Sequence, residues 1–360
     1  MLSFLHGSDF HLSASFAHSS LREIAIKRRN DIWRSVESLF ELAKMKEVDF
    51  IFLTGDLFNE EYFTLSEMKR LVDLFNLIPE INIIITPGNH DPYRQDSLWT
   101  VVKMPDHVFL FKNERIEKLE FPKADIYGIA FENQHFKKEN LLDNLLLNEE
   151  KINILAIHGD VYDPDSPYLS IDRKELKKYP FDYIALGHIH KPAAADSRTM
   201  YPGSIEPLDF GEKGAHGVIY GEIEDGVLRT ERISLSKSVF LEHVFTIDNS
   251  FNYYELEGEL SEIKKNYSNK VYLRLILEGS LSKEYEIDME SLKEQLGGFF
   301  EYIEIIDNIS QEYDVEKIYE LNRSNLIGLF IDEIKMRKED PASKIALQVG
   351  LEALIEHGEK

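Results

Sequence analysis

Five blocks of polar residues recur along the first 190 residues, and each block directly follows an apolar run. The blocks are Asp9-Phe10-His11, Gly55-Asp56, Gly88-Asn89-His90, His158-Gly159-Asp160 and Gly187-His188-Ile189-His190. Most of the apolar runs are continuous rather than alternating, which is typical of strands buried on both faces. Because ligands bind outside the carboxyl ends of the strands in open α/β sheets, we expect the five blocks to meet at one rim.

The residue types in these blocks are typical of a transition-metal site. Imidazoles mixed with carboxylates and an amide oxygen favour Mn²⁺, Fe²⁺ or Zn²⁺, whereas Ca²⁺ and Mg²⁺ prefer shells made only of oxygen. The candidate ligands are Asp9, His11, Asp56, Asn89, His158, His188 and His190. Seven ligands exceed what one tetrahedral ion would use, so we expect a carboxylate to bridge two ions.

Two of the blocks place a pair of candidate ligands one residue apart. In Asp9/His11 and His188/His190, an extended residue would turn both side chains to the same side. A lone histidine in an apolar run is more often a satisfied core residue than a ligand, and a lone Asp-x-His is also a weak signal. The metal interpretation therefore depends on all five blocks occurring together, each at the end of an apolar run.

The composition is that of an ordinary globular protein, with 43% hydrophobic and 29% charged residues in a chain of 360. The absence of cysteine excludes disulfides and thiolate metal sites. We see no signal peptide and no apolar run near the ~20 residues of a membrane span, so we expect a cytoplasmic protein. The net charge of −24 opposes non-specific binding of nucleic acid, although bound cations can reverse the local field.

Strands and helices alternate through the first two thirds of the chain, which predicts an α/β layered sheet. Helical patterns lie between the first two strands and over 65–78. A hairpin over 217–223 and 227–235 closes this part. The expected strands before it are 2–9, 49–56, 81–89, 124–131, 151–159 and 181–188.

From about Phe240 the pattern changes to strand, helix, strand, helix, strand, which predicts a small α+β module. Amphipathic helices separated by Pro341 follow over 315–357. We therefore expect three domains, over residues 1–238, 239–310 and 311–360.

Taken together, the five blocks resemble the calcineurin-like metallophosphoesterases, whose pattern is D-x-H, G-D, G-N-H-[DE], H and G-H-x-H. Within them the chain is most similar to SbcD-type and YhaO-like DNA repair nucleases. The sequences that carry this similarity are "SDFHL" (8–12), "GDLF" (55–58), "GHIHKP" (187–192) and "YPGS" with "FGEKG" (201–204, 210–214). The resemblance implies a layered metallophosphoesterase β-sandwich flanked by helices, a small α+β capping domain and C-terminal helices.

The resemblance also implies roles for the site residues. Asp9, His11 and His190 would hold one Mn²⁺. Asn89, His158 and His188 would hold the other, and Asp56 would bridge the two; Fe²⁺, Zn²⁺ or Mg²⁺ are the substitutes. A hydroxide bridging the ions would attack phosphorus, and His90, which is not a ligand, would protonate the leaving oxygen.

Asn59 departs from the family pattern, because archaeal and eukaryotic relatives carry a histidine at this position that assists exonuclease chemistry. An amide cannot act as an acid near neutral pH, which leaves strand polarity and the preference between exonuclease and endonuclease cleavage open. Arg94, just after the third block, is the main expected phosphate contact. Weaker candidates are Lys191, Lys103 and the basic runs 27–29 and 173–178.

The implied partners are DNA, a second copy of the chain and an SbcC-like coiled-coil ATPase that binds the C-terminal helices. In the relatives, helices near the second and third blocks form the homodimer, here 65–78 and 97–104. Packing of the C-terminal helices on their own domains is the alternative reading of their apolar faces. Two other functions are also open: a phosphodiesterase or phosphatase for small nucleotides, and a non-catalytic scaffold for the ATPase.

Overall fold

The computed structural model describes residues 1–282, 285–337 and 340–357. The chain divides into two compact units, Met1–Leu241 and Glu242–Lys360. The strands of the first unit are β1 (Leu2–Gly7), β2 (Phe50–Leu53), β3 (Asn82–Ile85), β4 (Val108–Leu110), β5 (Glu117–Glu120), β6 (Ala124–Gly128), β7 (Ile152–His158), β8 (Tyr183–Gly187), β9 (Ala193–Ala194), β10 (Thr199–Tyr201), β11 (Gly217–Glu224) and β12 (Val227–Ser234). Its helices are η1 (Arg22–Ile24), α1 (Ala25–Lys46), α2 (Leu65–Asn76), α3 (Leu98–Val101) and α4 (Arg173–Leu176).

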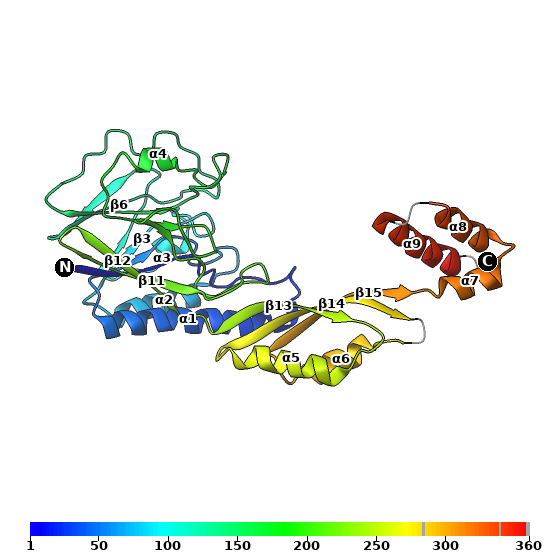
Figure 1. The fold of residues 1–360 in the computed structure, drawn as a ribbon. Coiled ribbons are helices and arrows are strands. Elements are labelled where there is room, and N and C mark those ends of the chain that lie inside the picture. The colour runs from blue at the N-terminus through cyan, green and yellow to red at the C-terminus, as the bar shows by residue number, and fades with distance from the viewer. Residues whose placement is uncertain (283–284, 338–339, 358–360) are drawn as a thin grey trace. The chain divides into compact units, whose positions relative to one another are not determined.

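The strands of the first unit form two six-stranded sheets, with the orders β12-β11-β1-β2-β3-β4 and β5-β6-β7-β8-β10-β9. Strands β1 to β4 run parallel, as do β6, β7, β8 and β10, while β11, β12, β5 and β9 pair antiparallel. The two sheets are layered between α1 and α2 on one side and α4 on the other (Figure 1). This arrangement confirms the expected layered α/β fold.

Alternation along the strands of the first sheet explains the layers. Leu5, Ile51 and Ile83 belong to the apolar cluster that also contains the buried faces of α1 and α2. Phe4 and Phe52 belong instead to the cluster shared with the second sheet, where the Phe4 ring lies 4.6 Å from that of Tyr183 between centroids. The first sheet is therefore covered by apolar residues on both faces.

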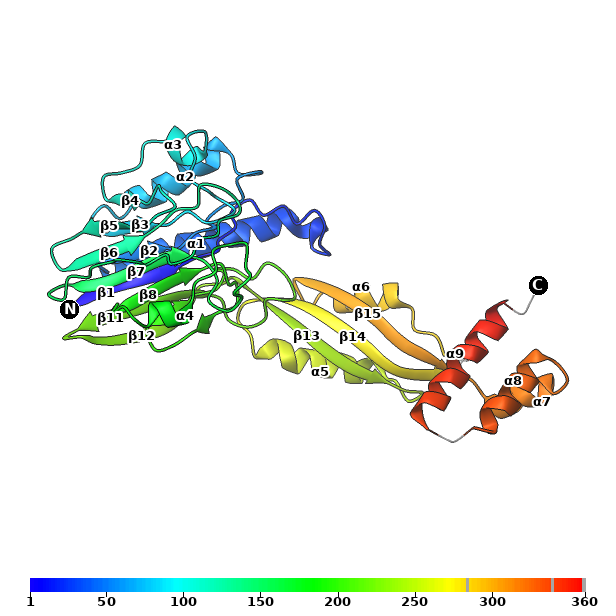
Figure 2. The ribbon, with the colours of Figure 1, turned by 90° about the horizontal axis from the view of Figure 1, so that it is seen from above.

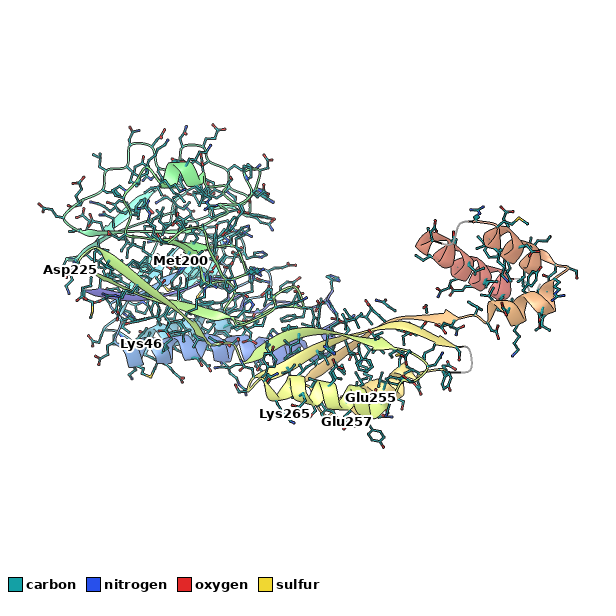
Figure 3. All side chains as sticks on the ribbon, in the orientation of Figure 1. Lys46, Met200, Asp225, Glu255, Glu257 and Lys265 are labelled. Atoms are coloured by element: carbon teal, nitrogen blue, oxygen red, sulfur yellow. The ribbon has the colours of Figure 1, made fainter. Side chains whose placement is uncertain are left out.

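The hairpin between β11 and β12 turns on Asp225 and Gly226, which have left-handed φ angles of 51° and 73°. Asp-Gly is a favoured pair for a two-residue hairpin of this kind, because both central residues need positive φ. Asp225 is labelled at this turn in Figure 3, where Met200 of β10 is labelled as well. The expected hairpin over 217–235 is thus formed.

A buried ionic cluster ties α1 to the segment that leads into β13 (Ser238–Ile247). The guanidinium of Arg28 donates to Glu206 Oε1 at 3.2 Å, to Ser238 Oγ at 2.8 Å and to the carbonyl of Pro207 at 2.6 Å. Ser35 Oγ and the backbone N–H of Lys237 each donate to Glu206 Oε2 at 2.7 Å. Arg28 and Glu206 are both fully buried, and the buried carboxylate of Asp31 also lies 3.4 Å from the guanidinium, so the charges of this cluster compensate one another.

The second unit contains a three-stranded sheet in the order β13-β14-β15 and five helices among its described residues. Helices α5 and α6 cover one face of this sheet (Figures 1 and 2), where Leu256, Leu275 and Leu292 are buried. In Figure 3, Glu255, Glu257 and Lys265 mark the solvent side of α5. The elements are β14 (Lys270–Ser282), β15 (Tyr302–Glu312), α5 (Tyr253–Lys265), α6 (Met289–Leu296), α7 (Val315–Asn322), α8 (Leu326–Lys335) and α9 (Pro341–His357).

No helix in the described parts of the chain is long and apolar enough to cross a membrane.

Candidate metal centre

The five polar blocks lie at the ends of β1, β2, β3, β7 and β8, as expected. The two sheets meet here, since His158 Nδ1 lies 2.9 Å from the backbone oxygen of Thr54 and Ser8 forms an isolated bridge to Ser204. Three of the four ligand candidates in the paired blocks have left-handed rather than extended backbone. Asp9, His11 and His188 have φ angles of 52°, 48° and 101°, so the chain turns sharply at these ligands instead of continuing as a strand.

Left-handed backbone is unfavourable for residues with a side chain and is often retained at functional sites. Asp56 adopts it too, with a φ of 52°. Glycines make the surrounding turns possible by close approach, because a Cβ at Gly55 would overlap the ring of His158 and one at Gly88 would overlap the carboxylate of Asp56. The local backbone is therefore shaped to bring these side chains together.

Three groups of imidazole and carboxylate atoms lie within 4.8 Å of one another among the described residues. They are Asp9–His11–His190, His11–Asp56–His90 and Asp9–Asp56–His158. Asp9 and Asp56 each occur in two groups, so the groups form one continuous cluster. These residues are almost fully buried except His90, which is exposed, and His190, which is half-buried.

The two imidazoles of His11 and His190 face each other, with their Nε2 atoms 2.9 Å apart. Each ring is held from behind: His11 Nδ1 lies 2.7 Å from Asn59 Oδ1, and His190 Nδ1 lies 2.6 Å from Glu212 Oε1. An acceptor at Nδ1 keeps the proton on that nitrogen and leaves the Nε2 lone pair pointing inward, as in histidines that bind metals. Two converging lone pairs fit a cation between them.

His158 is held in the same way by the carbonyl of Thr54 at 2.9 Å from Nδ1. Its Nε2 lies 3.3 Å from Asp56 Oδ2 and 2.9 Å from Asn89 Oδ1. The His188 ring is adjacent to that of His158, with centroids 5.3 Å apart, although His188 belongs to none of the three close groups. Its backbone N–H donates to Asp9 at 3.1 Å.

The buried charges of this cluster stabilise one another. Burial acts to raise the pKa of Asp56, but His158 and His11 outweigh it and hold that pKa well below its usual value. Burial acts to lower the pKa of His158, yet Asp56 and Asp9 raise it to about 9. Buried carboxylates thus require positive charge beside them, which imidazolium or a metal cation can supply.

His90 lies at the rim of the cluster. Its ring centroid is 4.9 Å from that of His11, and its backbone N–H donates to Asp56 Oδ1 at 2.8 Å. The exposed position leaves the His90 imidazole accessible from solvent, unlike the buried ligand candidates.

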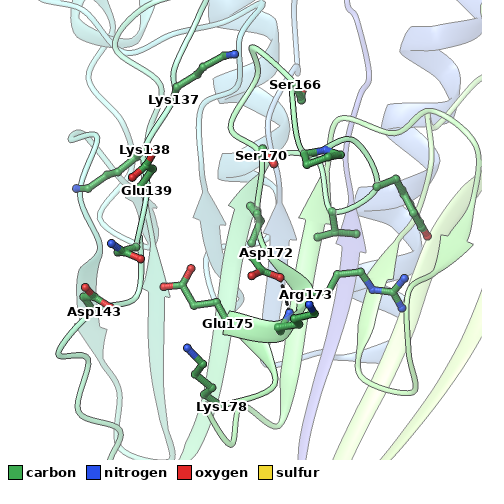
Figure 4. Close-up of a pocket in the computed structure, with 16 residues that line it drawn as sticks. Lys137, Lys138, Glu139, Asp143, Ser166, Ser170, Asp172, Arg173, Glu175 and Lys178 are labelled. Carbon is green, nitrogen blue, oxygen red and sulfur yellow. Dashed lines mark hydrogen bonds between the residues drawn. The ribbon is translucent and has the colours of Figure 1, made fainter.

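Arg94, the main expected phosphate contact, is already paired, with Glu60 at 2.6 Å and Asp96 at 3.2 Å. Lys191 is exposed beside His190 and lines a surface cavity with Arg232. The basic run 173–178 contributes to a different cavity of about 740 Å³ (Figure 4). Glu139, Asp143, Asp172 and Glu175 line that cavity as well, so its charge is mixed.

Two further residues, Asp91 and Glu212, support the ligand candidates. The Asp91 carboxylate accepts from the backbone N–H groups of Gly88, Asp56 and Leu57, at 2.6, 3.1 and 2.9 Å, and so joins the ends of β2 and β3. Glu212 holds His190. Glu212 lies within "FGEKG", one of the segments that carry the family resemblance. The sequence spacing alone does not predict that it contacts a histidine 22 residues away.

A sequence profile described as calcineurin-like phosphoesterase matches residues 2–192, more than half of the chain. The chain belongs to the calcineurin-like phosphoesterase family. This confirms the resemblance drawn from the five blocks, and the cluster of possible ligands supports a metal-dependent phosphoesterase.

Two proteins are similar to this chain over most of their own length. The Bacillus subtilis protein described as uncharacterized metallophosphoesterase YhaO is 26% identical over 353 residues, covering 91% of this chain and 85% of that protein. The DNA double-strand break repair protein Mre11 of Saccharolobus solfataricus is 26% identical over 304 residues, covering 78% and 76%. A solved structure, TT1561 of Thermus thermophilus, has a TM-score of 0.39 and 13% identity over 64% of this chain and 98% of that one, from which nothing further follows.

Proposed function

We propose that this phosphoesterase is the nuclease subunit of an SbcCD-like DNA repair complex and hydrolyses phosphodiester bonds with two Mn²⁺ ions. The observation that carries the proposal is the convergence of imidazole, carboxylate and amide donors from five strand ends. Relatives named for DNA double-strand break repair that align with most of this chain support DNA as the substrate.

The residues fit a pair of ions. Asp9, His11 and His190 would hold one. Asn89, His158 and His188 would hold the other, with Asp56 between them because it lies within reach of both His11 and His158. Two bound divalent cations lower the pKa of water and neutralise the charge on phosphoryl oxygens.

The chain itself supplies the proton for the leaving oxygen. His90 is exposed at the rim, next to His11, and its backbone is anchored on Asp56. General acid catalysis of this kind typically contributes 10²–10⁴-fold. Lys191 would contact a flanking phosphate. We also propose Arg94 as a phosphate contact. To bind a phosphate, its guanidinium would have to release the carboxylates of Glu60 and Asp96.

The terminal helices are the proposed docking surface for the coiled coil of the ATPase. Ile331 of α8 and Leu351 of α9 are buried, whereas a second set of apolar side chains in and next to these helices and in α7 is exposed. This set comprises Leu321, Leu326, Leu329, Met336, Ile345 and Val349. Exposed apolar side chains on helices suit recognition by another helix. We accordingly retain three functional domains, 1–238, 239–310 and 311–360.

The proposed homodimer would form through the region of α2 and α3. Leu65, Leu77 and Val101 are exposed there, although most apolar residues of α2 are buried in the core. Analytical ultracentrifugation of the full chain and of Leu77→Glu would test this surface, because a charge in place of an exposed apolar side chain of the interface should shift the protein to monomer.

Mn²⁺-dependent cleavage of single-stranded and hairpin DNA, measured beside hydrolysis of bis-p-nitrophenyl phosphate, tests the enzymatic proposal. Cleavage of both, with loss of DNA cleavage in His90→Ala, is the expected result. Turnover of the small ester alone would instead favour a phosphodiesterase for small nucleotides, which the net charge of −24 also favours. Bound metal with no turnover of either substrate would favour a scaffold.

A further inference from the structure

The segments "YPGS" and "FGEKG" lie directly behind His190, although the proposed chemistry assigns them no role. The Glu212 carboxylate bridges the two segments. Its Oε1 lies 2.6 Å from His190 Nδ1, and its Oε2 accepts from Ser204 Oγ at 2.6 Å. The Glu212 side chain is 12% exposed, so these contacts are largely shielded from water.

Further hydrogen bonds fix the carboxylate itself. The backbone N–H of Leu208 donates to Glu212 Oε2 at 3.1 Å, and His216 Nδ1 lies 2.9 Å from both the hydroxyl and the carbonyl of Ser204. With Oε2 engaged by two donors, Oε1 is directed at His190. The result is a continuous chain from His216 through Ser204 and Glu212 to His190.

The same loop also holds the backbone of His190. The N–H of Ser204 donates to the carbonyl of His190 at 2.9 Å. Gly203 has a φ of 81°, and a Cβ there would approach that carbonyl to 2.6 Å, so the close packing requires glycine. His190 is therefore constrained both at its ring and at its main chain.

We propose that Glu212 is the positioning residue for His190. Its carboxylate keeps the ring proton on Nδ1 and sets the ring orientation, so that the Nε2 lone pair faces His11 across 2.9 Å. Hydrogen bonding to a carboxylate also raises the basicity of the metal-binding nitrogen. The proposal rests on the metal-binding role proposed for His190.

His11 provides an internal comparison. Its Nδ1 is held by the neutral amide of Asn59, whereas that of His190 is held by a carboxylate. The two rings therefore share one geometry but differ in the charge behind them. This difference predicts that loss of Glu212 removes both orientation and basicity, whereas a glutamine at 212 removes mainly the basicity.

Mn²⁺ titration of the full chain, followed by the EPR signal of the free ion, tests the proposal without an activity assay. In Glu212→Ala we expect one class of site to weaken by about 10–100-fold and the other to keep its affinity. Glu212→Gln should give a smaller loss. Asp209→Asn is the matched control, because it removes a carboxylate from the same loop that hydrogen bonds the backbone of Gly211 and not His190; its affinities should be unchanged.

The outcomes separate this proposal from the function on which it rests. If the wild type binds no Mn²⁺ at the cluster, both fail. If the wild type binds two ions and Glu212→Ala and Glu212→Gln bind them equally well, the positioning role is overturned while the proposed function stands. Should Glu212→Ala not fold, Glu212→Gln decides the question. Recovery of kcat at saturating Mn²⁺ by a variant that is already folded without the metal, as judged by circular dichroism, would support positioning, because bound metal also stabilises a protein with a folding defect.

Discussion

The ring nitrogen Nδ1 of His11 lies 2.7 Å from the amide oxygen of Asn59. Asn59 stands where the resemblance led us to expect a histidine, and its side chain acts as an acceptor that orients a ligand candidate. The backbone N–H of Asn59 donates to the carbonyl of Leu12 at 3.0 Å, which fixes the main chain of Asn59 beside the segment that carries His11. The Asn59 amide therefore has a structural role in this chain, which is to hold the His11 ring.

Replacement of Asn59 should change metal binding. We expect Asn59→Leu to weaken Mn²⁺ binding at one site by about tenfold or more, because the proton on His11 Nδ1 loses its acceptor. Asn59→Asp should preserve or tighten binding, since a carboxylate accepts the same hydrogen bond. Isothermal titration with Mn²⁺ measures both variants, and equal affinity in wild type and Asn59→Leu would contradict the orienting role.

His90 should act on the reaction and not on the metal. We expect His90→Asn to lower kcat on DNA by about 10²–10⁴-fold and to leave Mn²⁺ affinity within about twofold of wild type. The exposed His18 offers a control, because His18→Asn removes an imidazole outside the cluster. A large loss of Mn²⁺ affinity in His90→Asn would identify His90 as a ligand, which its place beside His11 and Asp56 makes a real alternative.

Removal of Glu206 should destabilise the first unit. Glu206→Ala leaves the guanidinium of Arg28 buried without this carboxylate, and breaking a buried pair in this way typically costs about 3–5 kcal/mol. Denaturant unfolding followed by tryptophan fluorescence reports on this unit, because Trp33 and Trp99 are both buried in it. Glu37→Ala, which removes the exposed partner of Arg70, is the control and should cost less than about 1 kcal/mol. Equal losses of unfolding free energy in Glu206→Ala and Glu37→Ala would show that the buried Arg28–Glu206 pair stabilises the fold no more than the exposed pair does.

His6 should make the first unit sensitive to acid. It is fully buried, with Nδ1 2.8 Å from Tyr183 Oη and Nε2 3.0 Å from Thr54 Oγ1, and burial lowers its pKa to about 3. Below pH 6.5 the unfolded chain therefore binds a proton at His6 that the folded chain does not. Stability should fall as the pH decreases from 6.5 towards 3, by about 1.4 kcal/mol per pH unit from this group.

The measurement is the free energy of unfolding of wild type and His6→Asn at several pH values between 6.5 and 5. The variant is expected to be less stable at neutral pH but to show a shallower decrease towards acid. Parallel curves for the two proteins would contradict the assignment of this pH dependence to His6.

The layered α/β fold and the edge where the polar strand ends meet could both be predicted from the sequence, because both depend on local patterns. Continuous apolar runs identified β1, β2, β3, β7 and β8, and the parallel direction of the strands within each sheet then placed their polar ends together. Short strands such as β9 and β10 carry too few residues for a periodic pattern, and they were not anticipated.

The geometry at the ligands could not be derived in the same way. The left-handed φ angles of Asp9 and His11 depend on tertiary contacts. The backbone N–H of Asp9 donates to the carbonyl of Gly55, and that of His11 donates to the carbonyl of Asp56. Likewise, Glu212 and Asn59 reach their histidines only after distant segments have packed. Contacts of this kind produce no periodic pattern in a single sequence, so they could not be predicted from it.

Anomalous diffraction from crystals of the full chain soaked in Mn²⁺ tests the central claim most directly. We predict two peaks per chain, one between His11 and His190 and one beside His158 and Asn89, with Asp56 contacting both. An absence of peaks among these side chains in fully loaded crystals would contradict the account.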